Sequence, residues 1–139
     1  MKIFVKEVVV CITLAIFCVG AWADSQCPRE IQTDQSLKGE VGAWKVLRDQ
    51  SAHSLSEVKF FSGPPDQMLA LKYDDDVELK NGSYYLKWRF PAGNERYWVA
   101  CYYGRTYIGL SMALPDGVSE CRVDYSRTKR PQISGMVCK

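Results

Sequence analysis

The chain has 139 residues, with 18 Lys and Arg against 16 Asp and Glu, so its formal net charge is +2. This length is enough for one domain and not for two. The near balance of charge gives no reason to expect a nucleic-acid partner, or a partner surface that would need a strong positive field.

The first 23 residues have the pattern of a secretory signal peptide. Lys2 and Lys6 precede an apolar run over 8–19, and an Ala-x-Ala sequence ends at Ala23. The apolar run is only about half of the roughly 20 residues that a membrane-spanning helix needs. We therefore predict cleavage after Ala23, which leaves a single disulfide-stabilised domain over 24–139 and no membrane segment.

Four cysteines remain after the predicted cleavage: Cys27, Cys101, Cys121 and Cys138. An even number in an exported chain argues for two disulfides. Of the three possible pairings we favour Cys101–Cys121 with Cys27–Cys138, because the first would join neighbouring strands and the second would tie the two ends of the domain together. The close Cys-x-x-Cys pairs of zinc sites are absent, so neither a metal nor another cofactor is expected.

Short strands are predicted along the first half of the domain. The first two are expected over 27–33 and 44–49, the second with Trp44 and Val46 facing inward. A third over 54–61 ends at the strong turn signal Ser62-Gly63-Pro64-Pro65-Asp66. The segment 67–71 can form a helical turn or a short strand, because five residues are too few for periodicity to decide.

The clearest hairpin signal is Asn81-Gly82, between strands expected over 77–80 and 83–90. Asn-Gly can supply the two positive-φ positions of a type I′ turn. In the second strand, apolar and polar side chains alternate as in a half-buried strand. The outer face of that strand then carries Tyr85, Lys87 and Arg89.

The segment 97–103 is the expected central strand, since bulky side chains occupy both of its faces. Further strands are expected over 106–112, 118–125 and 132–138. Short strands repeated every 8–12 residues or so predict a mainly all-β fold, an antiparallel sandwich or barrel of about eight strands with little helix.

No catalytic motif emerges, and an enzyme is not expected. The single histidine, His53, is predicted to be an ordinary surface residue, and no Gly-x-Ser-x-Gly elbow is present. Oxidation of the four cysteines would exclude a thiol nucleophile. A hydrolase would have to use carboxylates brought together by the fold, with Glu78, Glu95 and Asp124 as the candidates.

Aromatic residues are concentrated between 84 and 107, on three expected strands. Because side chains alternate between the two faces of a strand, these aromatic residues cannot all lie in one core. Some should lie on the outer face beside basic residues. That face would be either an interaction surface or a plain solvent-exposed face. Tyr and Arg on a rigid sheet are typical of protein-binding hot spots, and sugar stacking uses the same residues. The predicted partner-binding residues are Tyr85, Lys87, Arg89, Tyr102 and the hairpin tip Gly104 and Arg105.

Motifs spread over most of the domain resemble those of a known family. They include Cys27-Pro28, Val58-x-Phe60-Phe61, Trp98-x-x-Cys101-x-Tyr103, Leu114-Pro115 and Cys121-x-Val123. As a set they are similar to a family of small exported proteobacterial proteins, mostly uncharacterised, one founding member of which was named from a typhoid Salmonella genome. The chain also resembles periplasmic lysozyme inhibitors more loosely. Gly104-Arg105-Thr106-Tyr107 matches their signature only in part.

The resemblance implies a periplasmic location, a β-rich fold without known catalysis, and a role like that of immunity or inhibitor proteins. The main hypothesis is a periplasmic protein that inhibits, or gives immunity to, a cell-wall-directed enzyme. Its partner would be a protein, such as a wall hydrolase or a secreted effector, bound through the aromatic and basic sheet surface and the hairpin tip. The alternative is a peptidoglycan- or glycan-binding module.

Overall fold

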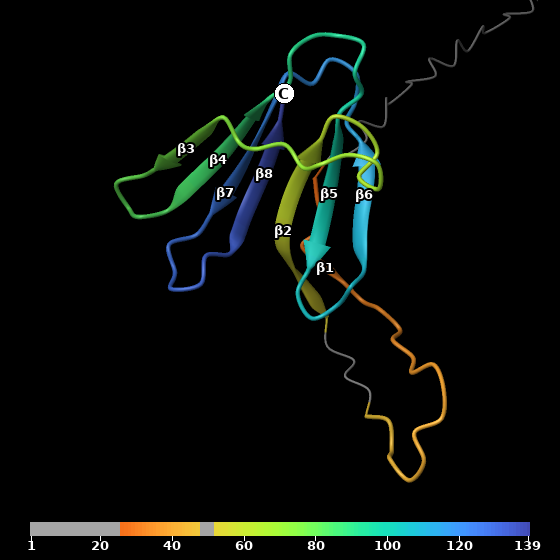
Figure 1. Cartoon of the computed structure of the whole chain (residues 1–139). Coiled ribbons are helices and arrows are strands. Elements are labelled where there is room, and N and C mark those ends of the chain that lie inside the picture. Colours follow the sequence, from red (N-terminus) through yellow and green to blue (C-terminus); the bar gives the residue numbers. More distant parts are fainter. Residues whose placement is uncertain (1–25, 48–51) are drawn as a thin grey trace, which may run out of the picture.

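The structure is a computed structural model, and it describes residues 26–47 and 52–139. These residues form eight strands and no helix (Figure 1). The mainly all-β antiparallel fold predicted from the sequence is confirmed. The predicted leader over 1–23 lies outside the described residues. Within them no helix is long and apolar enough to cross a membrane. The strands are β1 (Glu30–Ile31), β2 (His53–Phe61), β3 (Asp75–Glu78), β4 (Tyr84–Arg89), β5 (Trp98–Tyr103), β6 (Gly109–Ala113), β7 (Glu120–Tyr125) and β8 (Ile133–Cys138).

The strands form two four-stranded antiparallel sheets. The first has the order β1-β2-β5-β6 and the second the order β3-β4-β7-β8. Figure 1 shows β8 of the second sheet running beside β2 of the first, with the sheets diverging from that line. There the Arg29 guanidinium donates a hydrogen bond to the Ser134 carbonyl at 3.1 Å.

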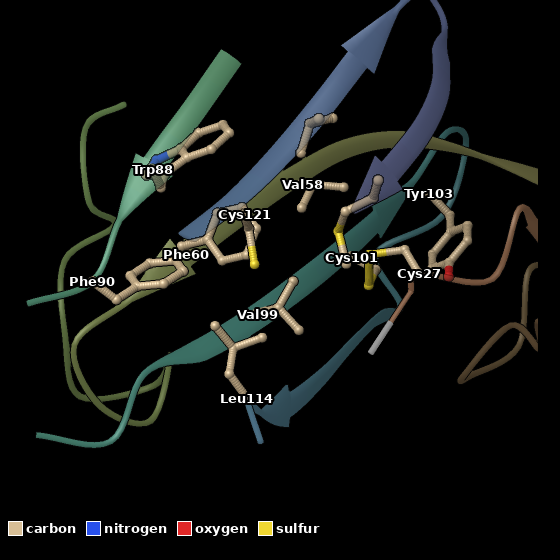
Figure 2. Close-up of a cluster of buried hydrophobic side chains, with 12 residues drawn as sticks. Cys27, Val58, Phe60, Trp88, Phe90, Val99, Cys101, Tyr103, Leu114 and Cys121 are labelled. Carbon is tan, nitrogen blue, oxygen red and sulfur yellow. A yellow bond between two sulfur atoms is a disulfide. The ribbon is translucent and has the colours of Figure 1, made fainter. Parts of the chain in front are cut away.

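The core lies between the inner faces of the two sheets, where their side chains point toward one another (Figure 2). Phe60 of β2 is its centre, fully buried, with its ring 4.8 Å from that of Trp88 on β4. Such aromatic pairs contribute about 0.5–1.5 kcal/mol beyond the area they bury. The Trp88 indole N–H donates to the Leu71 carbonyl at 3.2 Å, so the polar atom of this buried ring is satisfied.

Both disulfides are present, but the predicted pairing is wrong. Cys27 is joined to Cys101, and Cys121 to Cys138. The prediction assumed that Cys101 and Cys121 lie on neighbouring strands, whereas β5 and β7 belong to different sheets. Cys138 lies directly opposite Cys121 in the β7–β8 ladder, and Cys27 crosses the inner face of β5, where Tyr103 Oη donates to the Pro28 carbonyl at 3.0 Å.

The β3–β4 hairpin is where the sequence predicts it, but its turn is not type I′. Among the described residues, only Arg105 and glycines have positive φ, so Asn81 does not. Gly82 has φ 78° and donates its N–H to the Leu79 carbonyl at 2.8 Å, while the Leu79 N–H bonds to the Ser83 carbonyl. These bonds enclose a three-residue loop that ends on a left-handed glycine, the commonest alternative to a two-residue turn.

Two other local predictions differ from the structure. Residues 44–47 form no strand. Trp44 is 83% exposed and Val46 is about half exposed, so neither side chain faces inward. Residues 48 and 49 of that predicted strand lie outside the described residues. For 67–71 the sequence left a helical turn and a short strand open; the structure has a turn that ends at Gln67, and Ala70 forms a single bridge to Phe61. This bridge holds the connecting segment against the end of β2, before the chain continues to β3 in the second sheet.

Candidate partner-binding site

The six predicted partner-binding residues fall into two groups on different sheets. Tyr85, Lys87 and Arg89 lie on β4, opposite the core face that carries Trp88. Tyr102 is the last residue but one of β5 in the first sheet, and Gly104 and Arg105 follow this strand in the turn toward β6. Because the two sheets face each other across the core, their outer faces point apart. The fold therefore does not bring all six residues into one surface.

The β4 group is held by partners within its own sheet. The Arg122 guanidinium lies 4.1 Å from the centre of the Tyr85 ring and forms an ion pair with Asp124. Arg89 pairs with Asp75 of β3, and Lys87 lies 3.7 Å from Glu120 of β7. Acidic and basic side chains thus alternate across the outer face of the second sheet and neutralise one another.

The pKa values on this face follow from the same pairs. The hydrogen bond from Lys139 lowers the pKa of Glu120, helped by the nearby charges of Lys87 and Arg89, against an opposing effect of burial. The hydrogen bond and charge of Asp75 raise the pKa of Arg89. Both shifts favour the ionised forms of Glu120 and Arg89 near neutral pH. Exposed pairs of this kind contribute little stability each, but they keep the side chains in fixed positions.

The turn after β5 is anchored from below by the start of β2. The Gly104 N–H donates to the Ser54 carbonyl at 3.0 Å, and the Gly104 carbonyl lies 2.9 Å from His53 Nδ1. The backbone acceptor requires Nδ1 to carry the proton, so Nε2 accepts from the Gln35 amide at 3.3 Å. Contrary to the prediction, His53 is not a surface residue: only 6% of it is exposed.

Arg105, next in the turn, has φ 62° and is the one non-glycine residue with a left-handed backbone in the described part of the chain. This conformation costs a residue with a Cβ atom about 1–2 kcal/mol. Strain of this size persists where the surroundings impose it, and it clusters at functional sites. Here Gly104, the residue before Arg105, is fixed by its two hydrogen bonds to β2.

Exposed apolar side chains follow the turn directly. Tyr107 is fully exposed and Ile108 is nearly half exposed, while the Thr106 hydroxyl fixes the bend by accepting the Ile108 N–H at 3.2 Å. Behind the turn, Lys59 Nζ lies 5.1 Å from the centre of the Tyr102 ring. The result is a basic tip with two apolar side chains beside it, at the lower end of β5 in Figure 1. The sequence analysis named Gly104 and Arg105 as candidates for this tip, and it did not include His53, Tyr107 and Ile108, which the structure places beside them.

Nothing in the geometry builds a catalytic centre from the candidates named from the sequence. Glu78 lies opposite Tyr84 at one end of β4, whereas Glu95 follows the other end of that strand, so these carboxylates do not converge. Asp124 is paired with Arg122. In the described ranges no three His, Cys, Asp or Glu side chains are grouped as metal ligands would be.

A hollow lies at the opposite end of the molecule from the Arg105 turn. It is a cavity of about 480 Å³ between the loops 91–97 and 114–119. Arg96 and Asp116 pair across it at 3.8 Å. Because its lining includes the charged side chains of Glu95, Arg96 and Asp116 and its walls are loops, it does not resemble the apolar, pre-formed pockets that bind small molecules.

Comparison with known proteins assigns this domain to a family. The model of the type VI secretion system Tli immunity proteins matches residues 49–139, well over half of the chain. No curated protein and no solved structure matches. The matched region contains β2 to β8 and the Arg105 turn. The chain therefore belongs to the Tli immunity protein family of type VI secretion systems, whose members bind and inhibit a partner toxin.

Proposed function

We propose that this chain acts in the periplasm, where it binds and inhibits an imported toxin directed at the cell wall. Three features support this location. All four cysteines in the described part of the chain are in disulfides, which form and persist in oxidising compartments. The leader pattern over 1–23 is that of an exported protein. The cell wall lies in the same compartment.

We further propose that the Arg105 turn is the part of the surface that enters the toxin's cleft. The observation that carries this is the pair of hydrogen bonds that fix Gly104, directly before the left-handed Arg105. A rigid tip loses little conformational entropy on binding, so more of the contact energy appears as affinity. Arginine and tyrosine are also the side chains most often found at the energetic centre of protein interfaces.

The β4 group is proposed to have a lesser role. Tyr85, Lys87 and Arg89 are already paired with Arg122, Glu120 and Asp75. A partner that binds these side chains would have to break or replace these pairs, and the free energy lost with them would offset the free energy of the new contacts. Their contribution would be electrostatic matching at the rim of an interface, and Arg105 would be the anchor.

The experiment is a protection assay in cells that export the partner toxin, identified beforehand by pull-down with the purified wild-type chain. Wild type should restore growth, and the chain without residues 1–23 should not, because it would remain in the reducing cytoplasm. Arg105→Glu should weaken the purified complex at least tenfold, while Arg130→Glu, the same charge change in the exposed loop before β8, should leave it within about twofold. Equal affinity of the two variants would remove the Arg105 turn from the proposal.

The glycan-binding alternative is less supported by the aromatic side chains. Tyr84 and Tyr125 stack on each other with ring centres 4.7 Å apart, and Arg122 and Lys59 lie over Tyr85 and Tyr102. Rings covered by protein groups are not open platforms for sugar stacking, which leaves the exposed rings of Trp44 and Tyr107 as the candidates for it. We expect Trp fluorescence to show no saturable change on titration with peptidoglycan fragments, and a saturable change would restore this alternative.

A further inference from the structure

Strand β6, which follows the Arg105 turn, has a free edge. It ends the first sheet and pairs only with β5 within the described residues. The Leu114 N–H donates to the Tyr97 carbonyl at 2.8 Å, and hydrogen-bonded pairs alternate in an antiparallel ladder. Leu110 and Met112 therefore bond to β5 as Leu114 does. The outward N–H and C=O groups belong to Gly109, Ser111 and Ala113, the three smallest side chains of the strand.

The other edges of the two sheets are protected. Acidic side chains make up three of the four residues of β3, and β1 is only two residues long. Edge β8 runs beside β2 and is contacted by Arg29. Such charges, short strands and covers are how proteins prevent unwanted strand pairing. By contrast, no charged residue occurs anywhere over 106–114, and β6 has none of these protections.

An apolar hollow lies beside this free edge. It measures about 230 Å³ and is lined by Leu110, Ser111 and Met112 of β6, by Val99 and Cys101 of β5, and by Gln26 and Pro28. Leu110 and Met112 face inward, so a strand added to β6 would point every second side chain toward this hollow. Backbone pairing for affinity and a pocket for alternate side chains are the two elements of recognition by strand addition.

The structure favours the toxin over a second copy of this chain as the added strand. Two copies paired only through β6 would share five residues each, whereas stable interfaces involve about 20–30 residues a side. The toxin would contact β6 together with Arg105, Tyr107 and Ile108, which lead directly into the strand. The contact would then be continuous with the proposed binding tip.

We propose that β6 is the docking strand for an extended, uncharged segment of the toxin. That segment pairs with the outward backbone groups of Gly109, Ser111 and Ala113 and places an apolar side chain in the hollow between Pro28 and Met112. This inference rests on the proposed function, because it requires a bound toxin. It goes further by naming the strand, the backbone groups and the chemistry of the partner segment.

The first test is amide hydrogen exchange of the wild-type protein, alone and with the purified partner toxin that the pull-down identifies. In the free protein the amides of Gly109, Ser111 and Ala113 should exchange at least about tenfold faster than those of Leu110 and Met112. In the complex the same three should slow at least about tenfold. An unchanged alternating pattern in a saturated complex would overturn the inference.

The second test uses Ser111→Pro with Ser111→Ala as its matched control. Proline removes one outward N–H at an edge position where the fold does not use it, so its unfolding midpoint should stay near that of wild type. The proline variant should bind the toxin at least tenfold more weakly, and the alanine variant should bind as wild type does. If proline prevents folding, the exchange experiment on the wild type still decides.

The outcomes separate the two proposals. Failure of the wild type to bind the toxin contradicts the proposed function itself. Binding that is equal for the wild type and both variants, with fast exchange at the three edge amides, leaves the function standing and overturns strand addition. A concentration-dependent dimer with those amides already protected in the free protein would assign the edge to a second copy instead.

Discussion

At the scale of single residues, a buried histidine determines the shape of the proposed binding tip. His53 Nδ1 contacts the Gly104 carbonyl at 2.9 Å, and its backbone neighbour Ser54 accepts the Gly104 N–H. Both partners are the first two residues of β2. The residue before the strained Arg105 is therefore fixed by a strand that is 50 residues away in the sequence and cannot be seen from the turn alone.

Removal of this side chain should have a measurable cost. We expect His53→Ala to lower the free energy of unfolding by about 1–3 kcal/mol, because it leaves a shielded carbonyl without its donor. His53→Asn should retain most of the stability, since the asparagine Nδ2 can occupy the place of Nδ1. Urea denaturation of the oxidised proteins measures both. Equal losses for the two variants would show that the ring's packing matters and the hydrogen bond does not.

Tyr125 gives the second prediction at this scale. Burial, assisted by Tyr84 and Glu57, raises its pKa to about 12. The folded state then binds the phenolic proton more tightly than the unfolded state, whose pKa is near 10. The stabilisation from this group is complete below pH 10 and is lost as the pH rises from 10 toward 12.

Tyr125→Phe isolates this effect because it keeps the ring that stacks on Tyr84, with ring planes 3° apart. After allowance for partial exposure, the wild type should lose on the order of 1 kcal/mol more than the variant between pH 10 and 12. Urea midpoints at several pH values provide the measurement. Parallel pH profiles for the two proteins would show that Tyr125 titrates normally.

At the scale of elements, alternation predicts strands and their faces well, but it does not determine what the chain does between them. In β4 the sequence correctly placed Trp88 toward the core and Lys87 and Arg89 outside, because one buried face imposes a period of two. Trp44 misled the prediction, since a bulky residue in a short apolar run resembles a strand whether or not a partner strand exists. The buried state of His53 also depends on distant segments, so no local pattern indicates it.

At the β3–β4 turn, the conformation of one glycine predicts the effect of its replacement on stability. Gly82 has φ 78°, and a Cβ atom there would lie 2.8 Å from Arg127 Cδ. We expect Gly82→Ala to destabilise the protein by about 1 kcal/mol, the cost of a left-handed alanine. Arg127 is flexible and can move away.

The matched control for Gly82 is Gly93→Ala. Gly93 is exposed, and nothing lies within 4 Å of its would-be Cβ, so its replacement should change the unfolding free energy by less than about 0.5 kcal/mol. Thermal or urea unfolding distinguishes the two variants. A neutral Gly82→Ala would mean that the three-residue loop can adopt another turn.

At the scale of the whole molecule, the topology decides which cysteines meet. Sequence order suggested that Cys101 and Cys121 are neighbours, but the chain crosses from the first sheet to the second between them. Each disulfide therefore has a distinct role. Cys27–Cys101 fastens the N-terminal segment to the central strand, and Cys121–Cys138 joins two adjacent strands of the second sheet.

The two bonds should differ in their contribution to stability. They close loops of different length, with sequence separations of 74 and 17 residues. In the chain-entropy model the longer closure stabilises the fold by roughly 4.5 kcal/mol and the shorter by roughly 3 kcal/mol. Both residues of the first bond are buried, whereas only Cys121 of the second is, so the loss of packing adds to the difference that the loop lengths predict.

The double variants Cys27→Ala/Cys101→Ala and Cys121→Ala/Cys138→Ala test this ranking by urea denaturation. We expect the first to be the less stable, because it releases both the longer loop and the segment whose Pro28 carbonyl accepts Tyr103 Oη. The hollow beside β6 includes Gln26 and Pro28, so this variant should also lose toxin affinity while the second keeps it. The reverse order of stability, or equal toxin binding by both, would show that the N-terminal segment supports neither the core nor the β6 edge.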